Sequence, residues 1–452
     1  MKIQFLGATQ TVTGSKYLIK TNDIEILVDC GLFQGYKDLR LRNWAPLTIN
    51  PSSIKFILLT HAHIDHSGYI PLLVKNGFRG KILCTEATKK LANILLPDSG
   101  YLQEEEARYA NKKGYTKHKP TLPLYTKKDA EIALSYFQTV PFDKPFMLHD
   151  GFYASFHYAG HILGASLIRL IHEETSILFS GDLGRLNDPL MKPPIDPPNS
   201  TYLVIESTYG DRLHDETDPE KQFGEIINRT SKRGGSILIP AFAVGRTQSI
   251  LYYIHQLKLK NEIPDLPIFV DSPMATNASE IFYRHANLHR LTNEESAIVG
   301  KSATYVRSVE ESIELTNKKM PMIIISASGM ATGGRVLHHI RNLAPDYKNT
   351  ILFSGFQAGG TRGDRMIRGE KEIKMFGQMI PIRAEIAQIS NISAHADYKE
   401  ILTWLSHLKT TPRRVFITHG EQEASDALKA KIEHEFNWNV EIPKYLDQYE
   451  LT

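Results

Sequence analysis

The sequence predicts an α/β protein in which a parallel α/β domain interrupts a strand-rich one. The chain has 452 residues, which is more than one hydrophobic core ordinarily serves. Strand-like segments dominate the first 30 residues and return between residues 145 and 207. After about residue 209, apolar runs repeatedly lead through a loop into a helical pattern. These three observations favour at least two domains of different construction.

The strand-rich part begins with three segments of apolar alternation broken by Gly and Asn, IQFLG, SKYLIKT and EILVDCG. SIKFILLTH is a short apolar run with a polar end, which predicts a buried strand. AHIDHSGYIPLLVKNG then takes helical spacing after its first turn and stops at a glycine. Residues 86–140 are expected to be mostly helical, and strands return in FYASFHYAG, SLIRLIH, SILFSGD and TYLVIEST.

The middle of the chain repeats a strand–loop–helix pattern, which is typical of a parallel sheet. The repeats are SILIPAFAVGRTQSILYYIHQL, PIFVDSPMATNASEIFYRHA, MIIISASGMATGGRVLHHIRNL and ILFSGFQAGGTRGDRMI. Near residue 371 a hairpin pattern returns in KEIKMFGQMIPIRAEIAQI, followed by a helix, the strand RRVFITHGE and a last helix. We therefore expect a discontinuous first domain, residues 1–208 and 371–452, around an insert of residues 209–370.

Composition excludes several classes of protein. Hydrophobic residues make up 42% and charged residues 23%, which excludes wholesale disorder. No apolar run approaches the roughly 18 residues of a membrane span, and the first residues lack a signal-peptide core, so we expect no membrane association. The two cysteines, Cys30 and Cys84, exclude a disulfide framework and a cysteine-based metal site, and they predict a cytoplasmic location. The net charge of +3 neither demands nor excludes a nucleic-acid partner.

The most informative residues are the six of HAHIDH, His61 to His66, where a strand ends and a helix begins. Residues two apart in an extended segment point the same way, so His61 and His63 can face one ion together. Asp65 and His66 enter the turn and can face a second point nearby. Three imidazoles and a carboxylate suit borderline metals such as zinc.

Four further candidates share one pattern, an apolar strand that ends in His or Asp beside a glycine. They are Asp29 in ILVDCG, His161 in AGHILGAS, Asp182 in LFSGDLG and His419 in VFITHGE. Each alone is also compatible with a turn aspartate or a capping histidine. Their shared pattern favours metal ligation.

HAHIDH, with Asp29 before it and His161 and Asp182 after it, resembles the successive motifs of the metallo-β-lactamase superfamily. The resemblance implies an αββα sandwich with a two-metal site in the cleft between its sheets. It implies one metal on His61, His63 and His161, another on Asp65, His66 and His419, a bridging Asp182, and Asp29 orienting the cluster from behind. Two ions about 3.5–4 Å apart suit in-line attack on a phosphodiester, because they lower the pKa of a bound water toward about 7.

The insert resembles that of the β-CASP nucleases, including the endonuclease subunit of pre-mRNA 3′-end cleavage and its prokaryotic relatives. The resemblance runs nearly end to end, and its matching stretches are LLPDSGYLQEEEARYANKK before the insert and PAFAVGRTQ, SGMATGGR and GFQAGGTRGD within it. Glu206, His395 and His419 match the family motifs A, B and C, and a histidine at motif C implies RNA rather than DNA as substrate. Asp65, Glu206 and His395 are therefore the candidate catalytic residues; His395 would donate a proton or hold the phosphate, oriented by Glu206.

The insert also offers candidate phosphate-binding residues, since backbone N–H groups at Gly-rich helix starts bind phosphates. They are Ser328, Gly329, Gly333 and Gly334, with the side chains of Arg335, Arg246 and Arg362. A plain turn between strand and helix is the alternative for this loop.

The sequence thus predicts a metal-dependent ribonuclease of RNA processing or decay, acting on single-stranded RNA. Two zinc ions are the expected cofactors, with manganese as the substitute, and the resemblance implies a homodimer. The alternatives are a DNA nuclease, a small-molecule metallohydrolase of the same superfamily and a non-catalytic RNA-binding scaffold. The sequence leaves endonucleolytic and 5′-exonucleolytic action open.

Overall fold

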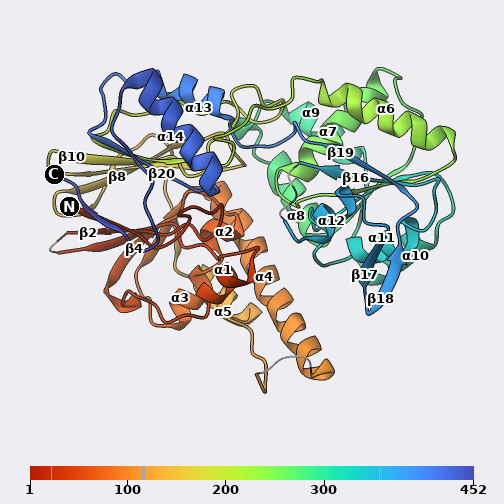
Figure 1. The fold of residues 1–452 in the computed structure, drawn as a ribbon, viewed down its shortest axis with the longest axis horizontal. Helices are drawn as coiled ribbons and strands as arrows, with labels where there is room; N and C mark the ends of the chain where they lie inside the picture. Colours follow the sequence, from red (N-terminus) through yellow and green to blue (C-terminus); the bar gives the residue numbers. More distant parts are fainter. Residues whose placement is uncertain (22, 115–117, 356, 358) are drawn as a thin grey trace. The chain divides into compact units, whose positions relative to one another are not determined.

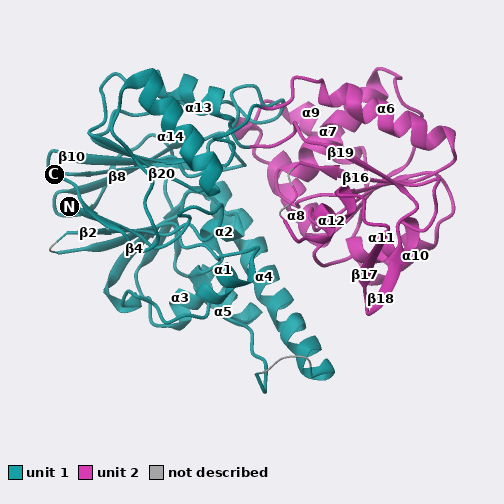
Figure 2. Cartoon of the chain, in the orientation of Figure 1, with its two compact units in different colours: residues 1–213, 395–452 teal, residues 214–394 magenta. Residues whose placement is uncertain are grey.

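The chain leaves its first structural unit after Leu213 and returns to it at His395 (Figure 2). The computed structural model describes residues 1–21, 23–114, 118–355, 357 and 359–452. Unit 1 comprises Met1–Leu213 and His395–Thr452, and unit 2 comprises His214–Ala394. Within the described ranges, no helix combines the length and apolar character that crossing a bilayer requires.

Unit 1 contains two seven-stranded sheets (Figure 1). The first begins as an antiparallel meander and continues in parallel from β3 onward. In spatial order its strands are β22 (Gln448–Glu450), β1 (Lys2–Phe5), β2 (Tyr17–Lys20), β3 (Glu25–Val28), β4 (Ile54–Leu58), β5 (Lys81–Cys84) and β6 (Phe137–Thr139). The early strands expected from the sequence are all present in this sheet.

The second sheet of unit 1 joins strands from both sides of the insert. Its central strands β10, β11 and β20 run parallel, so β20 lies beside β11 although more than 200 residues separate them in sequence. In spatial order the strands are β21 (Val440–Glu441), β20 (Arg414–Thr418), β11 (Tyr202–Glu206), β10 (Thr175–Phe179), β9 (Ser166–His172), β8 (Phe152–Tyr158) and β7 (Phe146–His149).

The core of unit 1 lies between these two sheets. One cluster of buried side chains joins Phe5 and Val28 of the first sheet to Phe156, Phe179 and Phe416 of the second. Helices flank the pair of sheets, which gives the expected αββα sandwich (Figure 1). The helices of unit 1 are α1 (Lys37–Arg42), η1 (Pro51–Ser53), α2 (Ile64–Ser67), α3 (Ile70–Lys75), α4 (Glu86–Lys113), α5 (Lys127–Leu134), α13 (Tyr398–Leu405) and α14 (Gln422–Phe436).

Unit 2 is built on a six-stranded, all-parallel sheet, as its strand–loop–helix repeats predict. In spatial order the strands are β14 (Thr304–Val306), β13 (Ile268–Asp271), β15 (Ile323–Ser326), β12 (Ile237–Pro240), β16 (Thr350–Ser354) and β19 (Glu385–Ile389). The helices are α6 (Pro219–Lys232), α7 (Arg246–Leu259), α8 (Pro273–Tyr283), η2 (Ala286–Leu288), α9 (Asn293–Lys301), α10 (Val309–Asn317), α11 (Val336–Leu343) and α12 (Arg362–Ile367).

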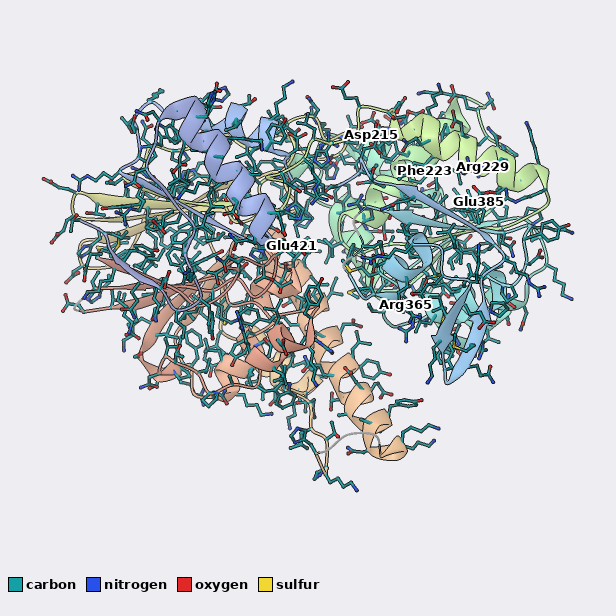
Figure 3. All side chains as sticks on the ribbon, viewed as in Figure 1. Asp215, Phe223, Arg229, Arg365, Glu385 and Glu421 are labelled. Carbon is teal, nitrogen blue, oxygen red and sulfur yellow. The ribbon has the colours of Figure 1, made fainter. Side chains whose placement is uncertain are left out.

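The second unit extends further along the chain than the insert expected at residues 209–370. The hairpin β17 (Glu372–Met375) and β18 (Gln378–Pro381) forms as expected but belongs to unit 2. The strand after it, β19, pairs with β16, and its Glu385 forms an ion pair of 2.5 Å with Arg229 of α6 (Figure 3). The alternation of apolar and polar residues in the hairpin resembles that of the strands in the first domain. Only the pairing of β19 with β16 shows that this part of the chain belongs to unit 2.

Candidate metal centre

Every expected metal ligand lies at or just beyond the end of a strand of unit 1. HAHIDH follows β4, with His63 extended before α2 and Asp65 and His66 in the first turn of that helix. His161 follows β8, Asp182 follows β10 and His419 follows β20. His419 has a φ of 51°, a left-handed backbone that turns the chain sharply where the strand stops. These loops bring residues from distant parts of the sequence to one place.

The first group of donors consists of His61, His63, His161 and Asp182. Nε2 of His61 and Nε2 of His161 lie 3.1 and 3.3 Å from Nδ1 of His63. Asp182 Oδ2 lies 3.4 Å from His61 Nε2 and 3.5 Å from His161 Nε2. The four ligand atoms all fall within 4.8 Å of one another, so one ion can contact all of them.

The second group consists of Asp65, His66 and His419, and it shares Asp182 with the first. Nε2 of His66 and Nε2 of His419 lie 3.1 Å apart, and Asp65 Oδ2 lies 3.4 Å from His419 Nε2. The other carboxylate oxygen of Asp182, Oδ1, lies 3.1 Å from His66 Nε2. Asp182 therefore presents one oxygen to each group, as expected of a bridging residue.

Asp29 lies behind the ligands and is completely buried. Its Oδ2 lies 2.8 Å from Nδ1 of His66, and its carboxylate accepts hydrogen bonds from the backbone N–H and the hydroxyl of Thr60. Thr60 Oγ1 is also 3.1 Å from Nδ1 of His61, and Thr208 Oγ1 is 3.0 Å from Nδ1 of His419. Such contacts fix which ring nitrogen faces a metal. Only the position of the two threonines beside strand ends could have indicated them from the sequence.

Glu206 and His395, the residues matched to motifs A and B, contact each other. Both carboxylate oxygens of Glu206 lie 3.1 Å from Nδ1 of His395. Glu206 is buried at the end of β11 and accepts a further hydrogen bond of 2.6 Å from the backbone N–H of Leu183. The ring of His395 lies 4.4 Å from that of His161, centroid to centroid. Glu206 thus orients His395 beside the first group of donors.

The electrostatics of the site favour neutral imidazoles in the first group. Burial, with the nearby charge of His66, lowers the pKa of His61 to about 3, and burial likewise lowers the pKa of His161. Burial opposes protonation of His395 as well, but Glu206, Asp182 and Asp65 outweigh it and raise the pKa of His395 to about 9. Metal ligation requires neutral imidazoles, and the first group has them without any ion.

The donor set fits a bound cation. Asp182 Oδ1 is buried and accepts no hydrogen bond from any residue that the structure describes. A buried carboxylate oxygen without a donor is costly, and a cation between the imidazoles removes that cost. Imidazole nitrogens with carboxylate oxygens are the donors that zinc and similar divalent ions prefer. The residues present therefore fit a metal centre.

The candidate phosphate-binding residues of unit 2 do lie between a strand and a helix, from the end of β15 to the start of α11. Ser328 Oγ accepts a hydrogen bond of 3.1 Å from the backbone N–H of Thr332. Gly334 has a φ of 81°, which favours glycine, and Gly333 faces open space. Gly329 lies against Phe242, so that a Cβ there would come within 3.0 Å. The structure is compatible with a phosphate loop and with a plain turn.

Arginines of this region contact protein acceptors. Arg246 Nη1 donates to the carbonyl oxygen of Ile392, in the segment that leads to His395. Arg362 donates to the carbonyl oxygens of Ala331 and Thr332 and so supports the same loop from outside. These contacts hold the loops in place, and the phosphate-binding role expected of the two side chains stays a prediction.

Arg335 belongs to a buried network that the sequence did not reveal. Its Nη1 donates a hydrogen bond of 2.7 Å to Asp271 Oδ1 at the end of β13. Ser312 Oγ donates to Asp271 Oδ2 at 2.5 Å, and His339 Nε2 lies 2.6 Å from the same oxygen. Burial opposes the ionisation of Asp271, but the hydrogen bonds from His339, Ser312 and Arg335 outweigh it and lower the pKa of the carboxyl.

Fold and site together define a metallo-β-lactamase-type hydrolase with an inserted α/β unit. Family models agree along the chain: the metallo-beta-lactamase superfamily matches residues 11–220, the Beta-Casp domain residues 247–366, and the Zn-dependent metallo-hydrolase RNA specificity domain residues 379–443. The last match spans the end of unit 2 and the return to unit 1. With the histidine and aspartate groups, these matches support metal binding.

Whole-chain relatives agree with the family models. A ribonuclease of Thermus thermophilus is 33% identical over 95% of this chain and 95% of its own length. Transcription termination factor FttA of Pyrococcus abyssi is 30% identical over 100% of this chain and 71% of its own, and FttA of Methanocaldococcus jannaschii is 28% identical over 99% and 71%. The chain therefore belongs to the β-CASP family of the metallo-β-lactamase superfamily.

A solved structure shares the fold alone. A protein of unknown function from Enterococcus faecalis superposes with a TM-score of 0.56 at 13% identity, covering 99% of both chains.

Proposed function

We propose that this protein is a metal-dependent ribonuclease that hydrolyses phosphodiester bonds of single-stranded RNA in RNA processing or decay. The observation that carries the proposal is the pair of donor groups joined at Asp182. The ribonuclease among the relatives and the RNA specificity domain support RNA as the substrate.

The proposed cofactors are two zinc ions, for which manganese can substitute. His61, His63 and His161 would hold one ion, Asp65, His66 and His419 the other, and Asp182 would contact both. When bound, such ions acidify water and neutralise charge on phosphate oxygens. Asp29 contacts Nδ1 of His66 and Thr60 contacts Nδ1 of His61, which would leave Nε2 of each ring for an ion.

His395 is the proposed proton donor to the departing 3′ oxygen. Its Nδ1 faces Glu206, so the proton would leave from Nε2, and the carboxylate stabilises the protonated ring. His395→Ala should slow cleavage by about 10²–10⁴-fold, the usual contribution of a positioned acid. Metal content, measured on the same sample, should be unchanged. Wild-type cleavage by a fully metal-loaded His395→Ala protein would remove this role.

The primary test is a time course on a 5′-labelled single-stranded RNA, with zinc or manganese added. The Asp182→Asn, His63→Ala double variant and a chelator-treated wild type serve as matched controls. The proposal is supported if the untreated wild type cleaves the RNA, leaving 5′-phosphate and 3′-hydroxyl ends, and neither control does. Internal fragments formed first would identify an endonuclease, and mononucleotides formed first a 5′ exonuclease. A metal-loaded wild type that binds RNA without cutting it would contradict the proposal and favour a scaffold.

A cytoplasmic location and a homodimer are further parts of this proposal. They are supported by the family resemblance and by cysteine usage. Light scattering on the purified protein measures the oligomeric state directly.

A further inference from the structure

Residues 34–46, between β3 and β4, form a surface strip that is both aromatic and basic. Tyr36 is 65% exposed, Leu41 53% and Trp44 57%. Exposed large apolar side chains gathered on so short a segment mark an interaction surface. The strip also carries Lys37, Arg40 and Arg42 against a single acid, Asp38.

Local hydrogen bonds hold the strip in place, although its side chains face solvent. Asn43 is buried and clamps the backbone of Phe33: its Oδ1 accepts from Phe33 N–H at 2.9 Å, and its Nδ2 donates to Phe33 O at 2.8 Å. The backbone N–H of Gln34 donates to Thr13 Oγ1 at 3.2 Å. These hydrogen bonds fix the backbone at both ends of the strip, which lowers the conformational entropy that the backbone loses on binding.

The strip begins where the chain leaves the metal centre. The backbone N–H of Cys30 donates to His66 O at 2.7 Å, and that of Leu32 donates to Ile64 O at 3.0 Å. Gly31 packs so closely on the metal motif that a Cβ there would lie 1.6 Å from Asp65 O.

Beside the strip lies a cavity of about 30 Å³ whose charged groups are cationic. Its lining includes Lys16, Arg42, Phe33, Tyr69 and Tyr445, together with the exposed strip residues Ala45 and Pro46. None of the described residues that line it is an aspartate or glutamate. The volume admits about two water-sized groups, the size of the two unesterified oxygens of a backbone phosphate.

Lys16 gives this cavity an uncompensated positive charge. The residue is only 6% exposed, and within the described chain no carboxylate lies in ion-pair distance of its ammonium. Nζ lies 4.6 Å from the ring centre of Phe33 and 4.7 Å from that of Tyr69, and its hydrogen bond to Gly14 O is long, 3.4 Å. Burial lowers the pKa of Lys16 to about 8. A buried cation without an anion is costly, and an anionic ligand would remove the cost.

We propose that the strip and the Lys16 cavity form a second binding site for single-stranded RNA, in which bases stack on Tyr36 and Trp44 and a backbone phosphate enters the cavity. This site rests on the proposed function, because it serves the part of an RNA chain that flanks the bond to be cut. Aromatic side chains interleaved with cations are the usual surface for single strands. A second copy of this chain fits less well, because a two-fold contact would place this basic strip against itself.

The test compares a 30-nucleotide and a 6-nucleotide labelled oligouridylate on the metal-loaded protein. Tyr36→Ala/Trp44→Ala should weaken binding of the 30-mer by at least about 10-fold, since each stacked base contributes appreciably, and should raise KM for the 30-mer without changing kcat. Binding and cleavage of the 6-mer should stay at wild-type values. Tyr153→Ala, which removes an exposed tyrosine from β8, is the matched control and should change neither.

Charge variants test the phosphate contacts separately. Lys16→Met should fold, because it removes a buried charge, and it should lower the slope of log affinity against log salt by about 0.7, one phosphate contact on a single strand. Lys37→Glu/Arg40→Glu should lower that slope further, whereas Lys55→Glu on β4 should not. The proposal would be overturned if the strip variants kept the wild-type RNA affinity and the wild-type slope of log affinity against log salt. It would also be overturned if the wild type were a dimer and Tyr36→Ala/Trp44→Ala converted it to monomers.

The two proposals fail in different ways. A wild type that cuts no RNA but loses 30-mer binding in the strip variants would contradict the ribonuclease and support the second site. A wild type that cuts RNA, with strip variants that bind and cut both oligomers equally well, would support the ribonuclease and overturn the second site.

Discussion

Two buried aspartates, each at the end of a parallel strand, meet histidines in opposite ways. Asp271 in unit 2 receives hydrogen bonds from Ser312 and Arg335 and a contact of 2.6 Å from His339. Asp182 in unit 1 is surrounded by imidazoles at 3.1–3.5 Å, yet its Oδ1 accepts no hydrogen bond from the described residues. Both oxygens of Asp271 have hydrogen-bonding partners, whereas Oδ1 of Asp182 has none among the described residues.

The difference separates a structural cluster from a cation site. Where every carboxylate oxygen has a donor, the protein itself completes the electrostatics, and a metal would have to displace existing bonds. Where acceptors converge without donors, the missing partner is a cation. Residue types alone do not make this distinction, because both clusters contain Asp and His.

Asp182→Asn should have the largest effect on activity. We expect the rate of RNA cleavage to fall by more than about 100-fold. Loss of a residue that only orients a metal ligand costs up to about 100-fold, and Asp182 is proposed to contact the ions itself. The free energy of unfolding of the metal-free protein should fall by less than it does for Asp271→Ala, because the nearby imidazoles hold the pKa of Asp182 well below its usual range but Oδ1 accepts no hydrogen bond from the described residues. Cleavage assays and urea denaturation measure the two quantities. If Asp182→Asn lowered the free energy of unfolding of the metal-free protein as much as Asp271→Ala does, the two clusters would not differ as described.

Asp271→Ala should lower the free energy of unfolding, in contrast to the effect of Asp182→Asn on activity. Removing the carboxylate leaves Arg335 and His339 without their partner, so we expect a loss of about 3–5 kcal/mol. Because hydrogen bonds lower the folded-state pKa of Asp271, the loss should be full above the ordinary carboxyl pKa of about 3.9 and shrink as pH falls through the lowered value. Urea denaturation across pH 2–7 measures both. Equal stability of variant and wild type at neutral pH would show that the network contributes nothing.

Ser312→Ala removes one donor and leaves the other two. A hydrogen bond to a charged group is worth about 1.5–3 kcal/mol, so the loss should be smaller than for Asp271→Ala. In the double variant with Asp271→Ala, most of this loss should disappear, because the hydroxyl then has no carboxylate to contact. Additive losses would show that Ser312 acts independently of Asp271.

Asp29→Asn should have the smallest effect, and on metal affinity rather than on folding. Asp29 contacts the proposed ligand His66 and would not contact the proposed ions, so we expect zinc affinity to fall by about 10–100-fold. Competition with a chromophoric chelator measures it. Excess zinc should restore much of the cleavage rate, which it should not do for Asp182→Asn.

The sequence predicted the fold class well, because the fold class depends on local pattern, whereas the division of the histidines and aspartates into two groups came from the family resemblance and stays a prediction. HAHIDH at a strand end and the strand–loop–helix repeats specify their own geometry. The end of the second unit was harder to predict. Whether β19 pairs with β16 or with the first unit depends on long-range register, which the alternation of EIAQI does not contain.

The Asp271 network shows why the contacts of some candidate residues could not be predicted from the sequence. IFVDSP shares the strand-then-aspartate pattern of ILVDCG, which holds Asp29, but has no glycine beside the aspartate, and nothing in its local sequence indicates the network that Asp271 joins. Arg335 was expected to bind phosphate from its place in a Gly-rich loop, but its guanidinium contacts Asp271 and the carbonyl oxygens of Val306 and Arg307. Which acceptor an arginine finds depends on neighbours distant in sequence.

The pairing of β20 with β11 sets an order of events during synthesis. The ribosome makes β20 about 10–40 s after β11, at 5–20 residues per second. During that interval the nascent chain holds His61, His63, His161 and Asp182 but not His419. Unit 2 is continuous in sequence and can close its own sheet first. The nascent protein would therefore carry an incomplete set of metal ligands until its last segment emerges.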